Sequence, residues 1–220
     1  MRSNINAQLV VFVFGTLLMI LLSACTGSSA STPIVSTTAA NAVGGSSSEV
    51  IVYASDLSPD ALSELDIIND SSSPNGQLIG LPNNGDELDP PPENDPHATF
   101  TVEVQSGVPY RCWIHMKVGT PQGRSTANVV WVQFSGSFDQ AKQEVFRPGT
   151  NSYLTVQGPE QQGWAWVGCG TGAESLVYFQ TNSEVTVRIQ AGAEGVGFDQ
   201  FLLSSAKFLT TPPSEPIVKK

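Results

Sequence analysis

The chain has few of the residues on which most enzyme active sites depend. It contains only two histidines, His97 and His115, although a serine or cysteine nucleophile needs a histidine base within reach. No Gly-x-Ser-x-Gly, His-Glu-x-x-His or phosphate-loop motif is present. Carboxylates are plentiful, but nothing in their spacing singles out a pair for glycoside hydrolysis. We therefore expect a protein that is not an enzyme.

Basic residues are also scarce. The sequence has 10 Lys and Arg against 20 Asp and Glu, which gives a formal net charge of −10. The only adjacent basic pair is Lys219-Lys220. An acidic chain without a basic patch is a poor binder of nucleic acid, so we expect no nucleic-acid partner.

The first 25 residues have the order of a bacterial export signal. Arg2 precedes an apolar run over residues 9–22, and Leu22-Ser23-Ala24-Cys25 closes it. The alternative is a transmembrane helix, but a span needs about 20 apolar residues, and no basic cluster follows this shorter run. The four closing residues resemble the bacterial lipobox, whose cysteine is acylated and becomes the new N-terminus. The resemblance implies a signal peptide over 1–24 and lipidation, including palmitate, at Cys25.

Lipidation at Cys25 would attach the protein to a membrane. Thr26, rather than Asp, follows the cysteine, and the resemblance then implies the outer membrane or cell surface of a bacterium. Residues 25–48 are rich in Ser, Thr, Ala and Gly, and such a segment cannot bury enough apolar surface to order itself. We expect it to be a flexible linker.

From residue 49 onward the pattern is that of strands. Apolar residues alternate with polar ones, or form short apolar runs, in six segments separated by Gly, Pro, Asn and Ser clusters: 50–53, 99–105, 110–118, 129–134, 185–190 and 198–203. Only 58–65 looks helical, and we expect a turn or brief helix there. These features predict an all-β domain over 49–212, an antiparallel β-sandwich or jelly roll, followed by a disordered tail over 213–220.

Five segments in this region resemble carbohydrate-binding modules of families 6 and 35 and the C-terminal domain of family 115 glycoside hydrolases: 108–114, 130–135, 163–166, 186–190 and 194–204. The resemblance implies a galactose-binding-like jelly roll and non-catalytic binding of a glycan or polysaccharide at the loop rim. A structural or protein-interaction module on the same fold, with no sugar site, is the alternative.

The resemblance also implies ligand residues. Trp164, in Gly163-Trp164-Ala165-Trp166, takes the position of a ligand-binding tryptophan, whereas Trp166 is expected to enter the core. Related modules place an asparagine in the loop before the last strand. Here that loop, 191–195, has no Asn, and Glu194 is the candidate to accept sugar hydroxyls instead.

Calcium is the one cofactor that the sequence suggests. Relatives hold a structural calcium with an aspartate of the last strand and acidic residues near the first strand, which here leaves Asp199 and Asp56. For Asp199, a hydrogen bond to turn backbone is the alternative, since a buried carboxylate needs a partner. The acidic, proline-rich segment 86–96 is expected to be a solvated loop, with calcium binding as its alternative.

Two cysteines remain after Cys25 is assigned to lipidation. An even pair in an exported protein readily forms a disulfide, so we expect a bond between Cys112 and Cys169. Two separate buried thiols are the alternative.

Overall fold

The computed structural model of the chain describes residues 48–82, 86–118, 128–158 and 163–219. Cys25, the predicted signal peptide and nearly all of the predicted linker lie outside these ranges. Within them, no helix has the length and apolar character that crossing a membrane requires.

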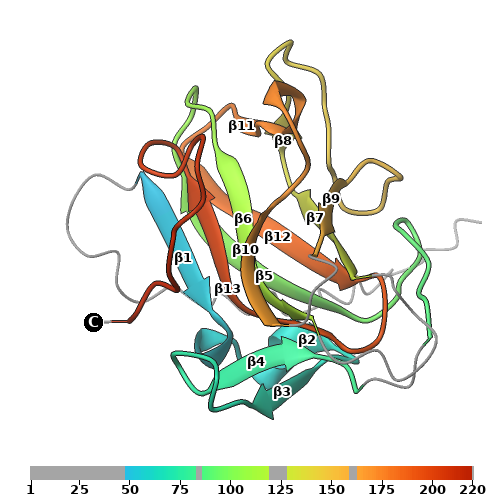
Figure 1. Cartoon of the computed structure of the whole chain (residues 1–220). Helices are drawn as coiled ribbons and strands as arrows, with labels where there is room; N and C mark the ends of the chain where they lie inside the picture. The colour runs from blue at the N-terminus through green and yellow to red at the C-terminus, as the bar shows by residue number, and fades with distance from the viewer. Residues whose placement is uncertain (1–47, 83–85, 119–127, 159–162, 220) are drawn as a thin grey trace, which may run out of the picture. The chain divides into compact units, whose positions relative to one another are not determined.

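One sheet has the strand order β10-β6-β13-β4-β3, with β1 also pairing with β13. The bounds of these strands are β1 (Glu49–Tyr53), β3 (Asp66–Asn69), β4 (Gln77–Gly80), β6 (Arg111–Val118), β10 (Gly163–Gly168) and β13 (Val196–Ser204). Strand β13 is central, because β6 lies along one side of it while β4 and β1 share the other (Figure 1). We call this the first sheet.

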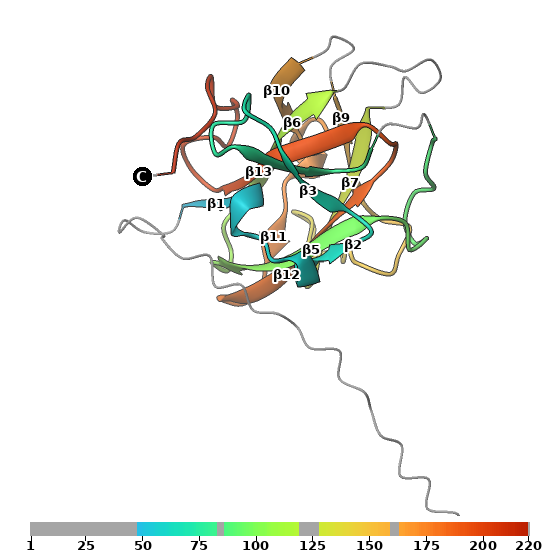
Figure 2. The ribbon, with the colours of Figure 1, turned by 90° about the horizontal axis from the view of Figure 1, so that it is seen from below.

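The second sheet has the order β2-β5-β12-β7-β9 and forms a separate layer (Figure 2). Its strands are β2 (Leu62–Ser63), β5 (His97–Val104), β7 (Val129–Phe134), β9 (Leu154–Gln157) and β12 (Ser183–Ala191). The remaining elements are β8 (Ser137–Phe138), β11 (Tyr178–Phe179), η1 (Ala54–Asp56), η2 (Pro59–Ala61) and η3 (Ala173–Ser175). The brief helix expected in 58–65 is η2, and β2 follows it directly.

The core lies between the two sheets because each long strand alternates. In β12, Val187 and Ile189 are fully buried in the core, whereas Arg188 between them is only half-buried. In β6, Cys112 and Ile114 are fully buried in the same core. A strand with period-2 alternation presents one face to the core and the other outward. The predicted all-β antiparallel β-sandwich is therefore confirmed.

The C-terminal end differs from the prediction. The described part of the expected disordered tail, 213–219, hydrogen-bonds to the first sheet through Glu215 and Ile217 and forms an ion pair through Lys219. Sequence composition alone misses these contacts because they come from residues far away in the chain.

Candidate functional site

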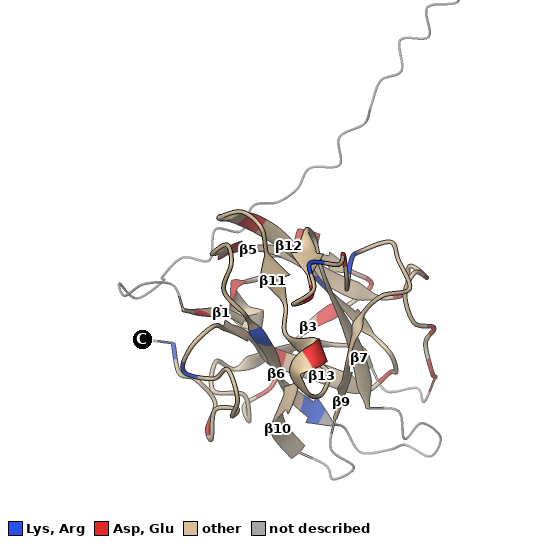
Figure 3. Ribbon diagram, turned by 90° about the horizontal axis from the view of Figure 1, so that it is seen from above, with Lys and Arg blue, Asp and Glu red and all other residues tan. Residues whose placement is uncertain are grey.

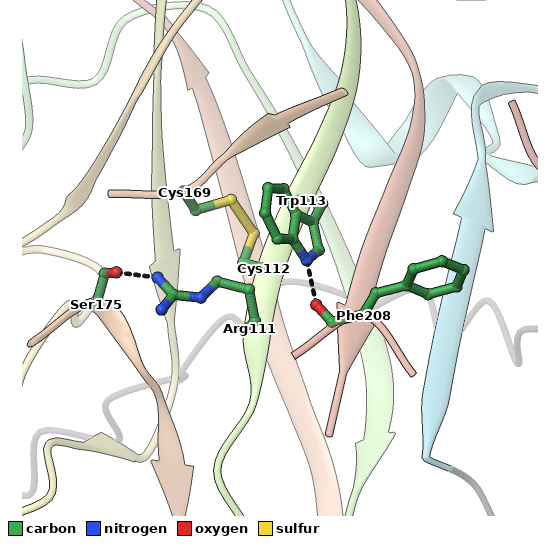
Figure 4. The surroundings of a disulfide bond; sticks show 6 residues. All are labelled: Arg111, Cys112, Trp113, Cys169, Ser175 and Phe208. Carbon is green, nitrogen blue, oxygen red and sulfur yellow. Dashed lines mark hydrogen bonds between the residues drawn. A yellow bond between two sulfur atoms is a disulfide. The ribbon is translucent and has the colours of Figure 1, made fainter. Parts of the chain in front are cut away.

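The disulfide joins two neighbouring strands of the first sheet. The Sγ atoms of Cys112 and Cys169 are bonded, with Cα atoms 5.2 Å apart, and both residues are fully buried. Cys112 lies on β6, and Cys169 follows the edge strand β10 (Figure 4). The predicted disulfide is confirmed, and it ties β10 to the body of the sheet.

The two tryptophans of β10 lie on the outer face of the first sheet. Trp164 is opposite Lys117 and Trp166 is opposite His115 in the register with β6. The Trp164 ring stacks on the His115 ring, with centroids 4.8 Å apart and planes 5° apart, and the Trp166 ring centroid lies 5.1 Å from that of His115. Both tryptophans are half-buried. The expectation that Trp166 enters the core is wrong, because alternation along β10 places it on the same face as Trp164.

Polar groups surround Trp164. Its indole Nε1 donates to Ser72 Oγ at 2.8 Å, and Lys117 Nζ lies 5.7 Å from its ring centroid. Lys117 also pairs with Asp70 at 2.5 Å. The hydrogen bond from Lys117, supported by one from Ser72, lowers the pKa of Asp70 to about 2. The Trp164 N–H is therefore already bonded within the chain, while part of its surface is accessible to a ligand.

Glu194 lies in the loop between β12 and β13. Its carboxylate Oε2 accepts from the backbone N–H of Asp86 at 3.4 Å, and its own N–H donates to the Asp86 carbonyl at 3.0 Å. The register places Gly163 and Val196 opposite the same residue of β6, so Trp164 and Glu194 come from the same end of the first sheet. Ligand binding by these two residues stays a prediction.

Asp199 is buried in a β-bulge of β13, between Phe198 and Gln200. Its Oδ1 lies 2.6 Å from His115 Nδ1, and its Oδ2 accepts from Ser73 Oγ at 2.8 Å. Side chains thus supply the partners that a buried carboxylate needs, rather than the turn backbone. Because Ser73 donates to the carboxylate and not to His115, the three residues do not form a nucleophile–base pair.

Asp56 has a different partner, since its carboxylate pairs with Lys219 Nζ. Over the described ranges, no group of three or more His, Cys, Asp or Glu side chains is arranged to hold a metal ion. Calcium bound by Asp56 and Asp199 stays a prediction, and it would require the ion to replace Lys219 and His115 as their partners.

The outer face of the second sheet carries polar residues that the sequence analysis did not single out. Thr101 on β5 and Gln133 on β7 are both buried, at 8% and 1% exposure. Arg188 of the intervening strand β12 is opposite Gln133. Thr186, two residues before Arg188 and on the same face of β12, is opposite Thr101. Among the described residues, Thr101 Oγ1 and Gln133 Oε1 have no hydrogen-bond partner. We call Thr101, Gln133 and Arg188 the polar face.

Two loops bury this polar face at its margins. On one side, the two N–H groups of Gln133 Nε2 are shared among three backbone carbonyls of the loop after β8, those of Arg147 (2.8 Å), Thr150 (2.9 Å) and Ser152 (3.1 Å). On the other side, Arg188 donates to the carbonyl of Glu93, in the acidic loop, at 3.4 Å. Burial between these loops lowers the pKa of Arg188. No local pattern in the sequence reveals this burial, because the partners lie 14 to 19 residues from Gln133 and 95 residues from Arg188.

An aromatic pair and a cavity lie beside the polar face. Trp131 of β7, 8% exposed, packs edge-on against Tyr153 with ring centroids 5.9 Å apart. A cavity of about 250 Å³ is bounded in part by Ser135, Arg147 and Glu184. Ser135 Oγ accepts from the backbone N–H of Thr186 at 2.7 Å, which places the cavity next to the polar face. Acidic residues are spread over many segments of the ribbon (Figure 3).

No family model and no curated protein matches this chain. Similar solved structures include a GH26-CBM35 β-(1,4)-mannanase from Podospora anserina, at 14% identity and a TM-score of 0.46, covering 77% of this chain and 29% of the mannanase. The C-terminal CBM6 of LamC, a marine laminarinase from Zobellia galactanivorans, has 10% identity and a TM-score of 0.44, covering 71% of this chain and 98% of the module. A family 35 carbohydrate-binding module from Clostridium thermocellum has 12% identity and a TM-score of 0.36, covering 70% and 98%. The chain thus spans less than a third of the mannanase, and likenesses this remote assign no function to it.

Proposed function

We propose that this chain is a membrane-anchored bacterial surface lipoprotein whose β-sandwich domain binds a glycan without catalysis. The observation that carries the proposal is the pair of buried, unpartnered atoms on the polar face, Thr101 Oγ1 and Gln133 Oε1. A buried polar atom without a partner costs about 1–3 kcal/mol. Sugar hydroxyls both donate and accept hydrogen bonds, so a glycan that displaced the segments covering this face would supply the missing partner to each atom.

The surroundings of these atoms suit a sugar. Arg188, opposite Gln133 in the register, contributes N–H donors to the same face, and a guanidinium presents them in a fixed planar geometry. Tyr153, which packs against the buried Trp131 and follows the Gln133 partner Ser152, provides half-buried ring surface near Gln133, which fits the C–H faces of a pyranose. Trp164 offers a second aromatic surface on the opposite sheet, where the sequence resemblance places a ligand.

Binding without catalysis agrees with the positions of the two histidines. His115 is buried against Asp199, and His97 Nδ1 lies 2.9 Å from the Asp95 carbonyl. Burial lowers the pKa of His97. Among the residues that the structure describes, the hydrogen bonds of the two rings go to Asp95, Arg188 and Asp199 and not to a serine or cysteine.

Membrane attachment rests on the lipobox-like residues ending at Cys25. Acylation of that cysteine would bury several chains, each CH₂ contributing about 0.8 kcal/mol. The Cys25→Ala variant is expected to appear in the soluble fraction, or to keep its signal peptide. Membrane retention and normal processing of this variant in a detergent-free fractionation would overturn the lipid anchor.

A glycan array followed by calorimetric titration of the domain from residue 48 onward tests glycan binding. Thr101→Val is nearly isosteric and removes only the unpartnered hydroxyl. We expect it to weaken glycan affinity about five- to thirtyfold without lowering the melting temperature. Thr171→Val, at an exposed threonine outside both sheets, serves as the matched control and should bind like the wild type.

The outcomes separate the possible sites. If Trp164→Ala lost glycan binding while Thr101→Val bound like the wild type, the glycan site would be at the Trp164 end of the first sheet and not at the polar face. Failure of every glycan on the array to bind would overturn the function. A protein-interaction module on the same sandwich is the second candidate. The extended C-terminal segment that hydrogen-bonds to Trp166 and Gln200 favours it, because it shows that the outer face of the first sheet can bind a peptide backbone.

A further inference from the structure

Residues 207–219, which we call the C-terminal strap, cross the outer face of the first sheet. The indole Nε1 of Trp113 donates to the Phe208 carbonyl at 2.6 Å (Figure 4), and that of Trp166 donates to the Glu215 carbonyl at 3.0 Å. Further along, the N–H of Ile217 donates to Gln200 Oε1 at 2.9 Å. The three sheet residues come from β6, β10 and β13, so the strap spans three adjacent strands.

The sheet beneath the strap carries buried apolar side chains beside polar ones such as Gln200. Leu202 is fully buried and is opposite Trp113 in the register, while its neighbours Phe201 and Leu203 belong to the core between the sheets. Strand alternation therefore places Leu202 on the outer face, where only a covering segment can bury it. Tyr53 on β1 is likewise buried outside that core, with Lys219 Nζ 5.8 Å from its ring centroid. The outer face thus holds a second apolar layer.

The contacts show which kind of segment this face accepts. Both indole N–H groups bond to backbone carbonyls, so they recognise the main chain of the strap rather than its side chains. Pro212, Pro213 and Pro216 lie between the first and last anchor points, and Pro213 is buried. Proline fixes φ and has no N–H, which favours an extended backbone whose carbonyls point outward. Aromatic faces that combine such contacts are a common way to bind proline-rich segments.

The strap covers this surface incompletely and leaves one buried polar group beneath it without a partner. Most residues of its middle part are exposed, including Thr210, Thr211, Pro212 and Ser214, and Val218 is 64% exposed. Beneath it, Gln200 is fully buried, and its Nε2 has no partner among the described residues. A segment that presented a carbonyl to this amide would satisfy a donor that the strap leaves unpaired.

We propose that the outer face of the first sheet is a docking surface for a proline-containing extended segment of a partner protein, and that the C-terminal strap is its displaceable occupant in cis. The contacts to carbonyls, the buried Pro213 and the unpaired Gln200 amide fit such a segment. This surface is on the opposite sheet from the polar face, so it is independent of glycan binding at Thr101 and Gln133. An occupant in cis raises the apparent Kd of a competitor to its intrinsic Kd divided by the fraction of time for which the surface is uncovered.

The test uses the full chain and a fluorescent peptide with the sequence of residues 207–219. Ile217→Pro removes the N–H that bonds to Gln200, and Val218→Pro, at the exposed neighbour, is the matched control. We expect the labelled peptide to bind Ile217→Pro about fivefold or more tighter than the wild type, with Val218→Pro unchanged. Lys219→Gln removes the ion pair with Asp56 and loosens only the end of the strap. It should also increase the affinity for the peptide, and it provides a second test if the proline variant misfolds.

Two further peptides test whether the surface recognises the prolines or the other side chains of the segment. A peptide that keeps all three prolines but has other side chains exchanged should compete, and one with all three prolines replaced by alanine should not. Equal binding of both peptides, or no gain of affinity in Ile217→Pro and Lys219→Gln, would overturn the proposal. Concentration-dependent dimers of Ile217→Pro that exclude the peptide would also overturn it, in favour of strap exchange between two copies.

Discussion

The imidazole of His115 and the indole of Trp164 stack in parallel, 4.8 Å apart between centroids and 5° apart between planes. His115 is itself bonded to Asp199, which is held by Ser73. The indole therefore rests on a buried polar group that cannot easily move. This relationship explains why Trp164 is fixed in place although it lies on the outer face of an edge strand.

Trp164→Ala and Trp166→Ala should have similar effects on stability. Both rings are half-buried and contact His115, so we expect each change to lower the free energy of unfolding by about 1–2 kcal/mol. Phe134→Ala, at a fully buried core ring, should cost about 3–5 kcal/mol. Urea denaturation measures all three. If Trp166→Ala lost as much unfolding free energy as Phe134→Ala, the result would contradict the outer-face position of Trp166 and indicate that it packs in the core.

Asp199→Ala should be among the most destabilising changes outside the apolar core. It leaves His115 Nδ1 and Ser73 Oγ buried without their partner, and each such group costs about 1–3 kcal/mol. Ser73→Ala removes the one hydrogen bond to Asp199 Oδ2 and leaves the bond between His115 and Oδ1 in place, so it should cost about 1.5–3 kcal/mol, less than Asp199→Ala. Equal loss of stability in the two variants, measured by thermal unfolding, would show that the His115–Asp199 contact contributes little.

The strands that could be predicted from the sequence are those with a clear period of two. The segments 99–105 and 185–190 alternate regularly and correspond to β5 and β12. The four-residue strands β3, β4 and β9 escaped prediction, because so few residues show no period. The disulfide was predictable because removing Cys25 leaves only one possible pair.

The site residues were harder to predict for a physical reason. Alternation shows that Trp164 and Trp166 share a face, but it does not show which face meets the second sheet. Thr101 and Gln133 occupy alternate polar positions, which predicts solvent exposure, yet both are buried, and Gln133 is held by carbonyls of the loop after β8. The strap escaped prediction in the same way, since its anchors on Trp113, Trp166 and Gln200 are long-range contacts.

Acid should weaken the end of the first sheet where Lys117 pairs with Asp70. The pKa of Asp70 is lowered from 3.8 to about 2, chiefly by the hydrogen bond from Lys117. A lowered carboxyl pKa contributes stability that is fully present above about pH 4 and is lost as the pH falls toward 2. The Asp70→Asn variant should be less stable than the wild type at neutral pH, and its stability should fall less steeply as the pH drops from about 4 to 2. Thermal melts between pH 5 and 2, in steps of about half a unit, test this, with Lys142→Gln as the control that should keep the wild-type slope.

Loss of the disulfide should destabilise the whole sandwich. The bond closes a loop with a sequence separation of 57 residues, and a loop of this size corresponds to about 4 kcal/mol in the chain-entropy model. We expect the Cys112→Ala/Cys169→Ala double variant to lose about 2–5 kcal/mol of unfolding free energy in urea denaturation. Both residues are fully buried, so the wild-type domain should melt normally in mild reductant and lose stability only when unfolding exposes the bond. Labelling the denatured, unreduced wild type with a thiol reagent provides the control. Two reactive thiols among Cys112 and Cys169 would contradict the bond, and a double variant as stable as the wild type would show that β10 is held to β6 by its hydrogen-bonded register alone.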